Sequence, residues 1–313
     1  MARAFVFPGQ GSQAIGMGKA LGEAFAEARA VFAEVDDALG ASLSRVMFEG
    51  PEAELTLTAN AQPALMAVSL AAIRVLEAQA GLDLSRDAAF VAGHSLGEYS
   101  ALAAAGALSL ADTARLLRLR GEAMQAAVPV GAGAMAALLG VEMAAAREIA
   151  AEAEQGSVCQ VANDNGGGQI VVSGAKAAVE RAIEIAKGRG VKRAVALPVS
   201  APFHCALMQP AAEAMRAALA TTTIHAPRVA VVANVTASPV MQPEEIRRLL
   251  VEQVTGTVRW RECVAYMAEQ GTGKFVECGA GKVLTGLLKR IAPQAAGISV
   301  GAPADLDAYR SFF

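Results

Sequence analysis

Short apolar runs rich in Val and Phe alternate with longer Ala-rich stretches along most of the chain. Such runs are typical of buried strands, and Ala-rich stretches are typical of helices that cover a sheet. The alternation therefore predicts an α/β protein with a mostly parallel sheet. The expected strands of this sheet are 4–7, 88–93, 229–234, 274–278 and 297–300.

Residues 127–198 follow a different order of predicted elements. Strand, helix, strand, strand, helix and strand succeed one another, and this βαββαβ order is ferredoxin-like. Turn residues, among them Pro129 and Pro198, mark both ends of the segment. We expect an inserted ferredoxin-like subdomain at 127–198 within a larger core formed by 1–126 and 199–313. Its elements are 134–139, 142–154, 157–162, 169–173, 175–187 and 192–197, with a glycine turn at 166–168.

Composition excludes several classes of protein. Hydrophobic residues make up 54% of the chain and charged residues 18%, which argues against disorder. The 27 Lys and Arg are outnumbered by 30 Asp and Glu, so the basic excess of a nucleic-acid binder is missing and no nucleic-acid partner is expected. The four cysteines show no C-x-x-C spacing, and we expect reduced, partly buried thiols and no metal.

Two uncharged runs approach the length of a membrane span, at 55–73 and 123–141. Asn60, Gln62 and Pro63 interrupt the first, and Pro129 with three glycines interrupts the second. We therefore expect buried segments and no membrane helix. The N-terminus lacks the apolar stretch of a signal peptide, so a cytoplasmic protein is expected.

A G-x-S-x-G motif at 93–97 provides a candidate nucleophile, Ser95. The motif follows an apolar strand and precedes a helical run, as a nucleophile elbow requires. The backbone N–H of Leu96 would lie at the start of this helix, where the helix dipole favours a developing negative charge. An idle serine in a glycine-rich turn is the alternative.

The serine needs a base, and the chain has three histidines. His94 adjoins Ser95, so its side chain should point away from the hydroxyl. His225 lies in a connection that we expect to be exposed. His204 lies in a loop held by two prolines, and it is the preferred base.

One arginine is predicted to be buried. On a helix over 111–125, Arg120 falls within the arc of Leu116, Leu117 and Met124. A buried guanidinium requires an anion. That anion could be an internal Asp or Glu, or it could be a substrate carboxylate held bidentately, and the sequence alone favours neither. The residues expected on the solvated face are Arg115, Arg118 and Glu122.

The loop at 7–13 follows the first strand and is rich in glycine, which suits backbone amides that face an anion or a carbonyl oxygen. It lacks the lysine and the spacing of a P-loop, and it lacks the G-x-G-x-x-G pattern. An ordinary tight turn remains the alternative.

Taken together, these segments resemble malonyl-CoA:acyl carrier protein transacylases over nearly the whole chain. The resemblance implies an α/β-hydrolase-like core, a ferredoxin-like insertion and a cleft between them. The motifs that carry it are Gly-Gln-Gly-Ser-Gln at 9–13, Gly-His-Ser-Leu-Gly-Glu at 93–98, Arg120-Gly121, Pro-Phe-His-Cys at 202–205 and Gly-Lys-Val-Leu-Thr-Gly at 281–286.

The resemblance also implies roles for individual residues. Ser95 would accept the acyl group, and His204 would be its base. Arg120 would bind the malonyl carboxylate, and the amides of Gln10 and Leu96 would hold the oxyanion. A backbone carbonyl at Gln253 would orient the histidine, so that no aspartate is needed. Asn163 resembles a family asparagine near the cleft and receives no role.

The chain departs from the family pattern at several positions. Thr257 stands where Pro is frequent, and Ala280 also stands where Pro is frequent. Phe203 stands where stand-alone bacterial enzymes often have Ser, and it resembles the malonyl-selective domains of larger synthases. A bulky ring there would exclude an α-methyl branch, so we expect malonyl to be preferred over methylmalonyl.

The expected reaction is ping-pong transfer of malonyl from malonyl-CoA to the phosphopantetheine thiol of acyl carrier protein, in fatty-acid synthesis, without a cofactor. Alternatives are a serine hydrolase or thioesterase, a non-catalytic carrier-binding module, and a transacylase of polyketide synthesis or malonate decarboxylation. The densest basic cluster could steer an acidic carrier or be a solvated loop. It comprises Lys187, Arg189, Lys192 and Arg193.

Overall fold

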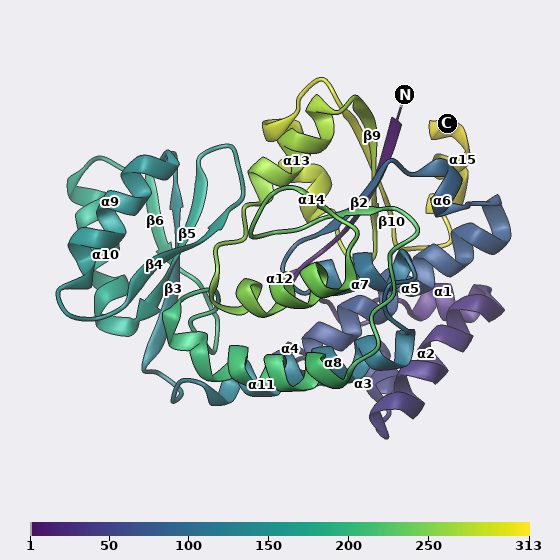
Figure 1. Ribbon diagram of the computed structural model, residues 1–313, viewed down its shortest axis with the longest axis horizontal. Coiled ribbons are helices and arrows are strands. Elements are labelled where there is room, and N and C mark those ends of the chain that lie inside the picture. The colour runs from purple at the N-terminus through teal and green to yellow at the C-terminus, as the bar shows by residue number, and fades with distance from the viewer. Residues whose placement is uncertain (1) are drawn as a thin grey trace.

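Two β-sheets organise the chain in a computed structural model that describes residues 2–313 (Figure 1). The larger sheet has the strand order β10-β9-β1-β2-β7-β8. Its first five strands in this order run parallel, and the short β8 pairs antiparallel with β7. The predicted α/β class with a mostly parallel sheet is confirmed. The strands are β1 (Ala2–Phe7), β2 (Phe90–Gly93), β7 (Ala230–Val232), β8 (Pro239–Val240), β9 (Thr272–Cys278) and β10 (Ala296–Val300).

Helices cover both faces of this sheet, because its central strands are apolar on both sides. Phe5 and Phe7 pack on one face, and Ala4 and Val6 pack on the other. The second face is covered by α13 (Trp260–Glu269) and α14 (Val283–Ile291). The remaining core helices are α1 (Lys19–Ala24), α2 (Ala26–Leu39), α3 (Leu43–Glu49), α4 (Glu52–Thr56), α5 (Thr58–Ala80), α6 (Leu84–Asp87), α7 (Gly97–Ala104), α8 (Leu110–Ala126), α11 (Gln209–Thr221), α12 (Pro243–Thr255) and α15 (Asp305–Phe312), with a 3-10 turn at Ala206–Met208.

Helix α5 corrects one expectation from the sequence. Asn60, Gln62 and Pro63 do not interrupt the apolar run, because the helix continues through them for 23 residues. Pro63 is the sixth residue of the helix, so its missing N–H removes one backbone hydrogen bond, and the extensive burial of the helix offsets this loss. Among residues 2–313, α5 is the one helix long and apolar enough to cross a membrane, yet 89% of its apolar window is buried inside the protein. It is the central helix of the core.

The smaller sheet forms a separate lobe, on the left in Figure 1. Its order is β4-β5-β3-β6, all neighbours are antiparallel, and the element order is the βαββαβ order expected for 127–198. The glycines at 166–168 all have positive φ and form the expected turn. The elements are β3 (Gly133–Leu139), α9 (Met143–Glu154), β4 (Cys159–Asp164), β5 (Gln169–Ala175), α10 (Lys176–Gly188) and β6 (Arg193–Ala196).

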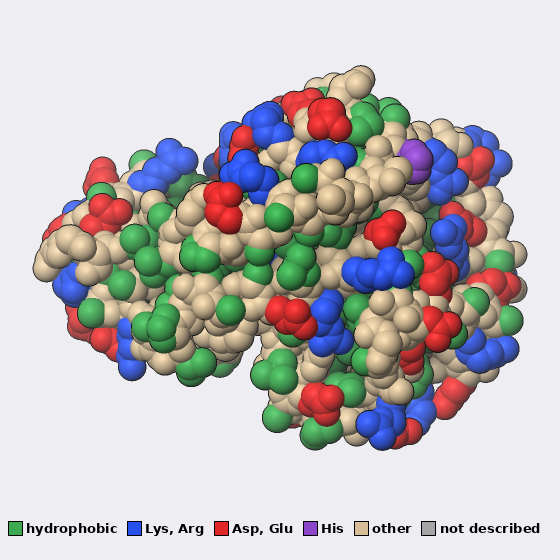
Figure 2. Space-filling model, turned by 60° about the horizontal axis from the view of Figure 1, so that its bottom comes forward, with side chains coloured by type: hydrophobic (Ala, Val, Ile, Leu, Met, Phe, Trp, Pro, Cys, Tyr) green, Lys and Arg blue, Asp and Glu red, His purple; other side chains and the backbone are tan. Residues whose placement is uncertain are grey.

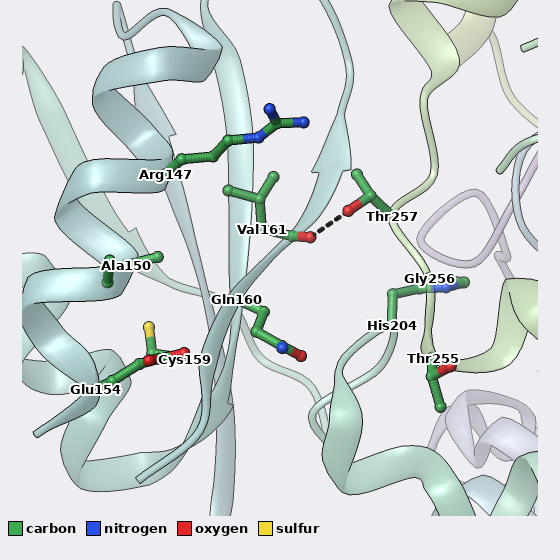
Figure 3. Close-up of a pocket in the computed structure, with 11 residues that line it drawn as sticks. Arg147, Ala150, Glu154, Cys159, Gln160, Val161, His204, Thr255, Gly256 and Thr257 are labelled. Atoms are coloured by element: carbon green, nitrogen blue, oxygen red, sulfur yellow. Dashed lines mark hydrogen bonds between the residues drawn. The ribbon is translucent and has the colours of Figure 1, made fainter. Parts of the chain in front are cut away.

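Strand β4 also contacts the core through backbone hydrogen bonds. The N–H of Val258 donates to the carbonyl of Ala162 at 2.8 Å, and the carbonyl of Val258 accepts from the N–H of Asp164 at 2.9 Å. Beside them, the Thr257 hydroxyl donates to the carbonyl of Val161 at 2.7 Å (Figure 3). The lobe is therefore joined to the core by more than its two connecting chains.

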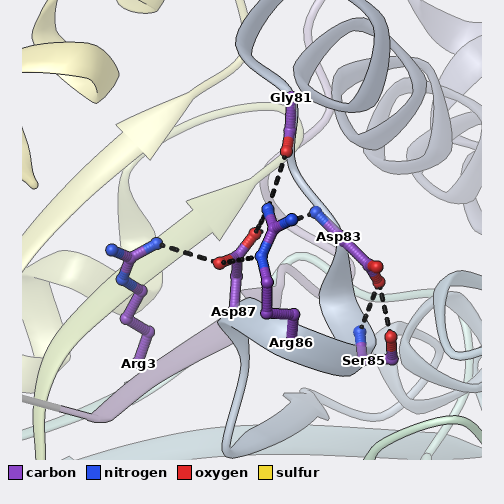
Figure 4. A network of polar contacts seen from close by, with 6 residues as sticks. All are labelled: Arg3, Gly81, Asp83, Ser85, Arg86 and Asp87. Carbon is purple, nitrogen blue, oxygen red and sulfur yellow. Dashed lines mark hydrogen bonds and ion pairs between the residues drawn. The ribbon is translucent and has the colours of Figure 1, made fainter.

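A polar network lies where the central strands β1 and β2 begin, at the amino-terminal end of the parallel strands (Figure 4). Asp87 lies 2.7 Å from a guanidinium nitrogen of Arg86 and 3.7 Å from one of Arg3, at the start of β1. Asp83 caps α6 by accepting from the backbone N–H of Ser85. These groups lie near the surface, where solvent screens ion pairs, so the network adds little stability. On the face that Figure 2 shows, acidic and basic side chains are interspersed.

Candidate active site

The turn between β2 and α7 brings Ser95 to the carboxyl edge of the large sheet. Only glycine fits on either side of it, because a Cβ on Gly93 would lie 1.9 Å from a backbone atom of Gly97. A Cβ on Gly97 would lie 2.3 Å from the carbonyl oxygen of Phe7. Ser95 itself has φ +54°, a conformation that L-residues rarely adopt. The motif therefore forms a strained nucleophile elbow.

His204 faces this serine. Its Nε2 lies 2.7 Å from the Ser95 hydroxyl oxygen, and its Nδ1 lies 2.9 Å from the carbonyl oxygen of Gln253. Because a carbonyl only accepts, Nδ1 carries the proton and Nε2 is free to accept one from the hydroxyl. Burial, and next the positive charge of Arg120, lower the pKa of His204 to about 3. The imidazole is therefore neutral at pH 7, as a general base must be.

The two other histidines lie elsewhere, as expected. His94 is turned away from the hydroxyl, and its Nε2 lies 2.9 Å from Oδ1 of Asn165 in the smaller lobe. Its ring lies 5.8 Å from that of Trp260. His225 is exposed in a connection before β7.

Arg120 is buried, as its helical position predicts, with 1% of its surface exposed. Its Nη1 donates to Oε1 of Gln62 at 2.7 Å, and its Nη2 donates to Oε1 of Gln253 at 2.9 Å and to the Ser95 hydroxyl at 3.1 Å. Within residues 2–313, its Nε has no hydrogen-bond partner. All three acceptors are neutral, so the internal Asp or Glu partner that the sequence left open is not found in the described chain. Burial lowers the pKa of Arg120, and an anion in the cleft would offset that cost.

Two backbone amides adjoin the serine. Strands β1 and β2 are parallel neighbours with Phe7 opposite Gly93, so the loops after them lie side by side and bring Gln10 next to Leu96. Both residues line the cleft that contains Ser95. Over residues 2–313, neither amide donates a hydrogen bond to another protein group. Both can therefore donate to a developing oxyanion.

The cleft between core and lobe has a volume of about 510 Å³. Ser95, His204 and Arg120 line it together with Phe203, whose ring is 8% exposed. Asn163 also lines it, and its buried Oδ1 has no partner. A second hollow of about 320 Å³ reaches His204 between α9 and residues 255–257 (Figure 3).

Three polar residues of the site were not assigned roles from the sequence. Gln62 binds Arg120, Asn234 accepts from the Ser95 N–H at 2.8 Å, and Glu98 accepts from Gln253 at 2.8 Å. Gln62 and Glu98 could have been found from the sequence, because each is a polar residue within a mostly apolar helical segment. A polar side chain is costly to bury without a hydrogen-bond partner, so each position indicates such a partner.

The basic cluster is partly neutralised within the small lobe. Lys187 pairs with Glu184 at 2.7 Å, and Arg189 pairs with Glu148 at 3.0 Å and with Glu152. Lys192 and Arg193 therefore carry most of the free positive charge of the cluster. In the described chain all four cysteines are free, as expected, and all four are buried, where only partial burial was expected. No cluster of three or more metal-ligating side chains occurs in the described part of the chain.

Comparison with known proteins places the chain in a family. The model of the acyl transferase domain matches residues 4–303. The chain belongs to the acyl transferase family. Within this family it is 46% identical to the malonyl CoA-acyl carrier protein transacylase of Bacillus subtilis, over 97% of this chain and 95% of that protein. The malonyl-CoA:acyl carrier protein transacylases are thus the branch of acyl transferases to which it belongs.

Solved acyl transferase structures agree with this assignment. The acyl-carrier-protein-S-malonyltransferase of Bartonella henselae is 58% identical, with a TM-score of 0.97 and coverage of 100% of this chain and 99% of that chain. A malonyl-transacylase in complex with a type II PKS acyl-carrier protein is 42% identical, with a TM-score of 0.96 and full coverage of both chains. The chain is therefore an acyltransferase enzyme with the fold of its family.

Proposed function

We propose that this chain transfers the malonyl group from malonyl-CoA to the phosphopantetheine thiol of acyl carrier protein, through a malonyl ester on Ser95. The observation that carries the proposal is one cleft that contains a serine within 2.7 Å of a neutral histidine and a buried arginine without a carboxylate partner. The first two groups suit acyl transfer, and the third suits an acyl chain that ends in a carboxylate.

In the first half of the reaction, Nε2 of His204 takes the hydroxyl proton while the Ser95 oxygen attacks the thioester carbon. The carbonyl oxygen becomes an oxyanion, which the amides of Gln10 and Leu96 stabilise. The C–S bond then breaks, and the leaving thiolate takes the proton from His204. The products are a malonyl ester and the free thiol of coenzyme A.

In the second half, the carrier thiol repeats these steps in reverse order. Its proton passes to His204, its sulfur attacks the ester carbon, and the Ser95 oxygen leaves with the proton. The chemistry requires no cofactor, because the thioester supplies the activated acyl group. The carbonyl of Gln253 keeps the imidazole in the required tautomer throughout.

Arg120 links substrate recognition to the base. The guanidinium has five N–H donors, and three hydrogen bonds to protein acceptors are present, so donors remain for a carboxylate. A bound malonyl carboxylate would neutralise the charge that helps lower the pKa of His204. The imidazole then becomes more basic once the correct substrate is bound, which favours removal of the proton from the Ser95 hydroxyl.

We further propose that the carrier serves fatty-acid synthesis and that the enzyme is cytoplasmic, where its four free thiols stay reduced. A polyketide carrier is the competing partner, since one similar transacylase binds a type II PKS carrier. Initial rates with the two classes of carrier distinguish them, and a preference for the polyketide carrier would contradict the assignment.

Intact-mass measurement tests the reaction itself. Mixing with malonyl-CoA should add one malonyl group to the wild-type chain and none to Ser95→Ala, and adding acyl carrier protein should move the group to the carrier. Rapid release of free malonate without a thiol would indicate a hydrolase instead. Absence of any label on the wild type would indicate a non-catalytic carrier-binding module.

A further inference from the structure

Glu98 is a buried carboxylate that the proposed mechanism does not use. It is the second residue of α7, three positions after Ser95, and 2% of its surface is exposed. Its Oε2 accepts from Nε2 of Gln253 at 2.8 Å and from the backbone N–H of Asn234 at 3.0 Å. Burial of a carboxylate is costly unless hydrogen bonds or opposite charges compensate it, so the partners of Glu98 show what holds it in place.

The contacts of Glu98 determine which way the Gln253 amide points. The amide has two N–H donors, and its nitrogen lies 2.8 Å from Glu98 and 3.0 Å from the carbonyl oxygen of Ser95. Its Oε1 therefore faces Nη2 of Arg120, at 2.9 Å. The reversed amide would place its oxygen against the carboxylate of Glu98 and the carbonyl of Ser95, and its NH₂ group against a guanidinium. Glu98 and the Ser95 carbonyl therefore select the observed orientation together, and Glu98 contributes the charged acceptor.

The same arrangement balances the charge of Arg120 without covering it. One amide separates the carboxylate of Glu98 from the guanidinium, and the described chain contains no direct ion pair between the two. A direct pair would use N–H groups that a substrate carboxylate needs. Burial raises the pKa of Glu98 to about 7, and the positive charge of Arg120 is among the groups that oppose this rise. Each group thus favours the charged form of the other.

We propose that Glu98 is a positioning residue for malonyl transfer, which acts through the side chain of Gln253 to hold Arg120 ready for the acyl carboxylate. The inference rests on the proposed function and adds a residue to it. It concerns selectivity for a carboxylated acyl group, because an acetyl group makes no contact with Arg120 through a carboxylate.

A second path leads from Glu98 to the nucleophile. The backbone N–H of Asn234 donates to Glu98, while its side chain accepts from the Ser95 N–H at 2.8 Å and donates to the carbonyl of Gly93 at 2.7 Å. If Glu98 acted only along this path, its loss would disturb the elbow. Transfer of malonyl and acetyl groups would then fall by the same factor.

The test compares Glu98→Gln with the wild type and with Glu277→Gln. Glu277 is an equally buried carboxylate in β9 that accepts from the N–H groups of Leu284 and Thr285 at the start of α14, away from the site. The measurement is the rate of acylation of Ser95 by malonyl-CoA and by acetyl-CoA. The malonyl-to-acetyl ratio should fall about tenfold in Glu98→Gln, the effect of one charge-assisted hydrogen bond, and stay unchanged in Glu277→Gln.

Two further variants define the path. The double variant Glu98→Gln, Gln253→Met should have the same malonyl-to-acetyl ratio as Gln253→Met alone. Gln253→Met already removes the amide that connects Glu98 to Arg120, so the second substitution has no further effect on the ratio. Glu98→Asp should lower the ratio as Glu98→Gln does, because the shorter side chain withdraws from the amide. If thermal unfolding shows that Glu98→Gln does not fold, the comparison is made with Glu98→Asp.

An unchanged ratio, or an equal loss for both acyl groups, would overturn the inference. A further fall of the ratio in the Gln253→Met background would also overturn it. These outcomes differ from failure of the proposed function, in which the wild-type enzyme itself acquires no malonyl group.

Discussion

The hydroxyl oxygen of Ser95 and Nε2 of His204 lie 2.7 Å apart, although 109 positions separate the two residues along the chain. The whole small lobe and its connections are inserted between them, so the fold must return the chain to the sheet edge to assemble the pair. The position of Arg120, hydrogen-bonded to the same hydroxyl, then allows predictions that separate acyl selectivity from acyl transfer.

Arg120→Ala should lower malonyl transfer about 100-fold or more, since two charge-assisted hydrogen bonds to the carboxylate are lost. Acetyl transfer should survive or improve. Arg118→Ala is the matched control, because Arg118 lies on the same helix, is half-buried and binds Asn60 outside the site. Steady-state rates with both thioesters provide the measurement, and an equal drop for the two would make Arg120 structural.

The acid limb of kcat/KM for acetyl-CoA should lie well below pH 6.5. His204 must be neutral to act, and a pKa lowered to about 3 means that it is protonated only far below its ordinary value. Rates of acetyl transfer, which do not depend on the charge of Glu98, should therefore stay level from about pH 8 down to about pH 5. Acetyl transfer by Arg120→Ala should show a limb at higher pH than the wild type, because the charge that lowers the pKa is gone. A wild-type limb near pH 6.5 would contradict the assignment.

The same shift has a consequence for folding. The unfolded chain binds a proton on His204 near pH 6.5, and the folded chain does not, so the free energy of unfolding should fall as the pH drops below 6.5 towards 3. His204→Gln should lose less stability over this range than the wild type. Denaturant titrations at several pH values measure the difference, and parallel slopes for the two proteins would argue against a depressed pKa.

Phe203→Ser should raise the methylmalonyl rate relative to the malonyl rate about tenfold, by making room for a methyl branch in the cleft. The ring is nearly buried, so the variant also loses stability, and thermal unfolding must be followed alongside the rates. Competition between the two thioesters gives the ratio directly. Comparable rates in the wild type would already remove Phe203 as a selectivity residue.

Reversing the charges of Lys192 and Arg193 should raise the KM for acyl carrier protein and leave the KM for malonyl-CoA unchanged. These two residues are chosen because Lys187 and Arg189 are already paired with glutamates. The effect should weaken with added salt. If the KM for the carrier does not move, the cluster is only a solvated loop.

Some features of the molecule follow from local pattern and others do not. The five parallel strands were predicted because their apolar runs are continuous, whereas the two-residue β8 has no pattern to detect. Helix α5 was misjudged because Pro63 was treated as a break, whereas the burial of the helix offsets the one backbone hydrogen bond that Pro63 removes. Helical periodicity predicted that Arg120 is buried. It did not predict the hydrogen-bond partners of the guanidinium, because Gln62 and Gln253 are 58 and 133 positions away along the chain. Partners of this kind are set by packing between elements, which one sequence does not encode locally.

The hydrogen bonds between Val258 and the end of β4 limit how the two lobes can move. Separation of the lobes would break these backbone hydrogen bonds and the ion pair of Arg261 with buried Asp164 at 2.7 Å. A hinge motion that opens the cleft for substrate would therefore cost free energy. We therefore expect the cleft to keep its width when the thioester and the phosphopantetheine arm of the carrier enter it. Selectivity for the acyl group would then depend on the preformed shape of the cleft, and not on closure of the two lobes around the substrate.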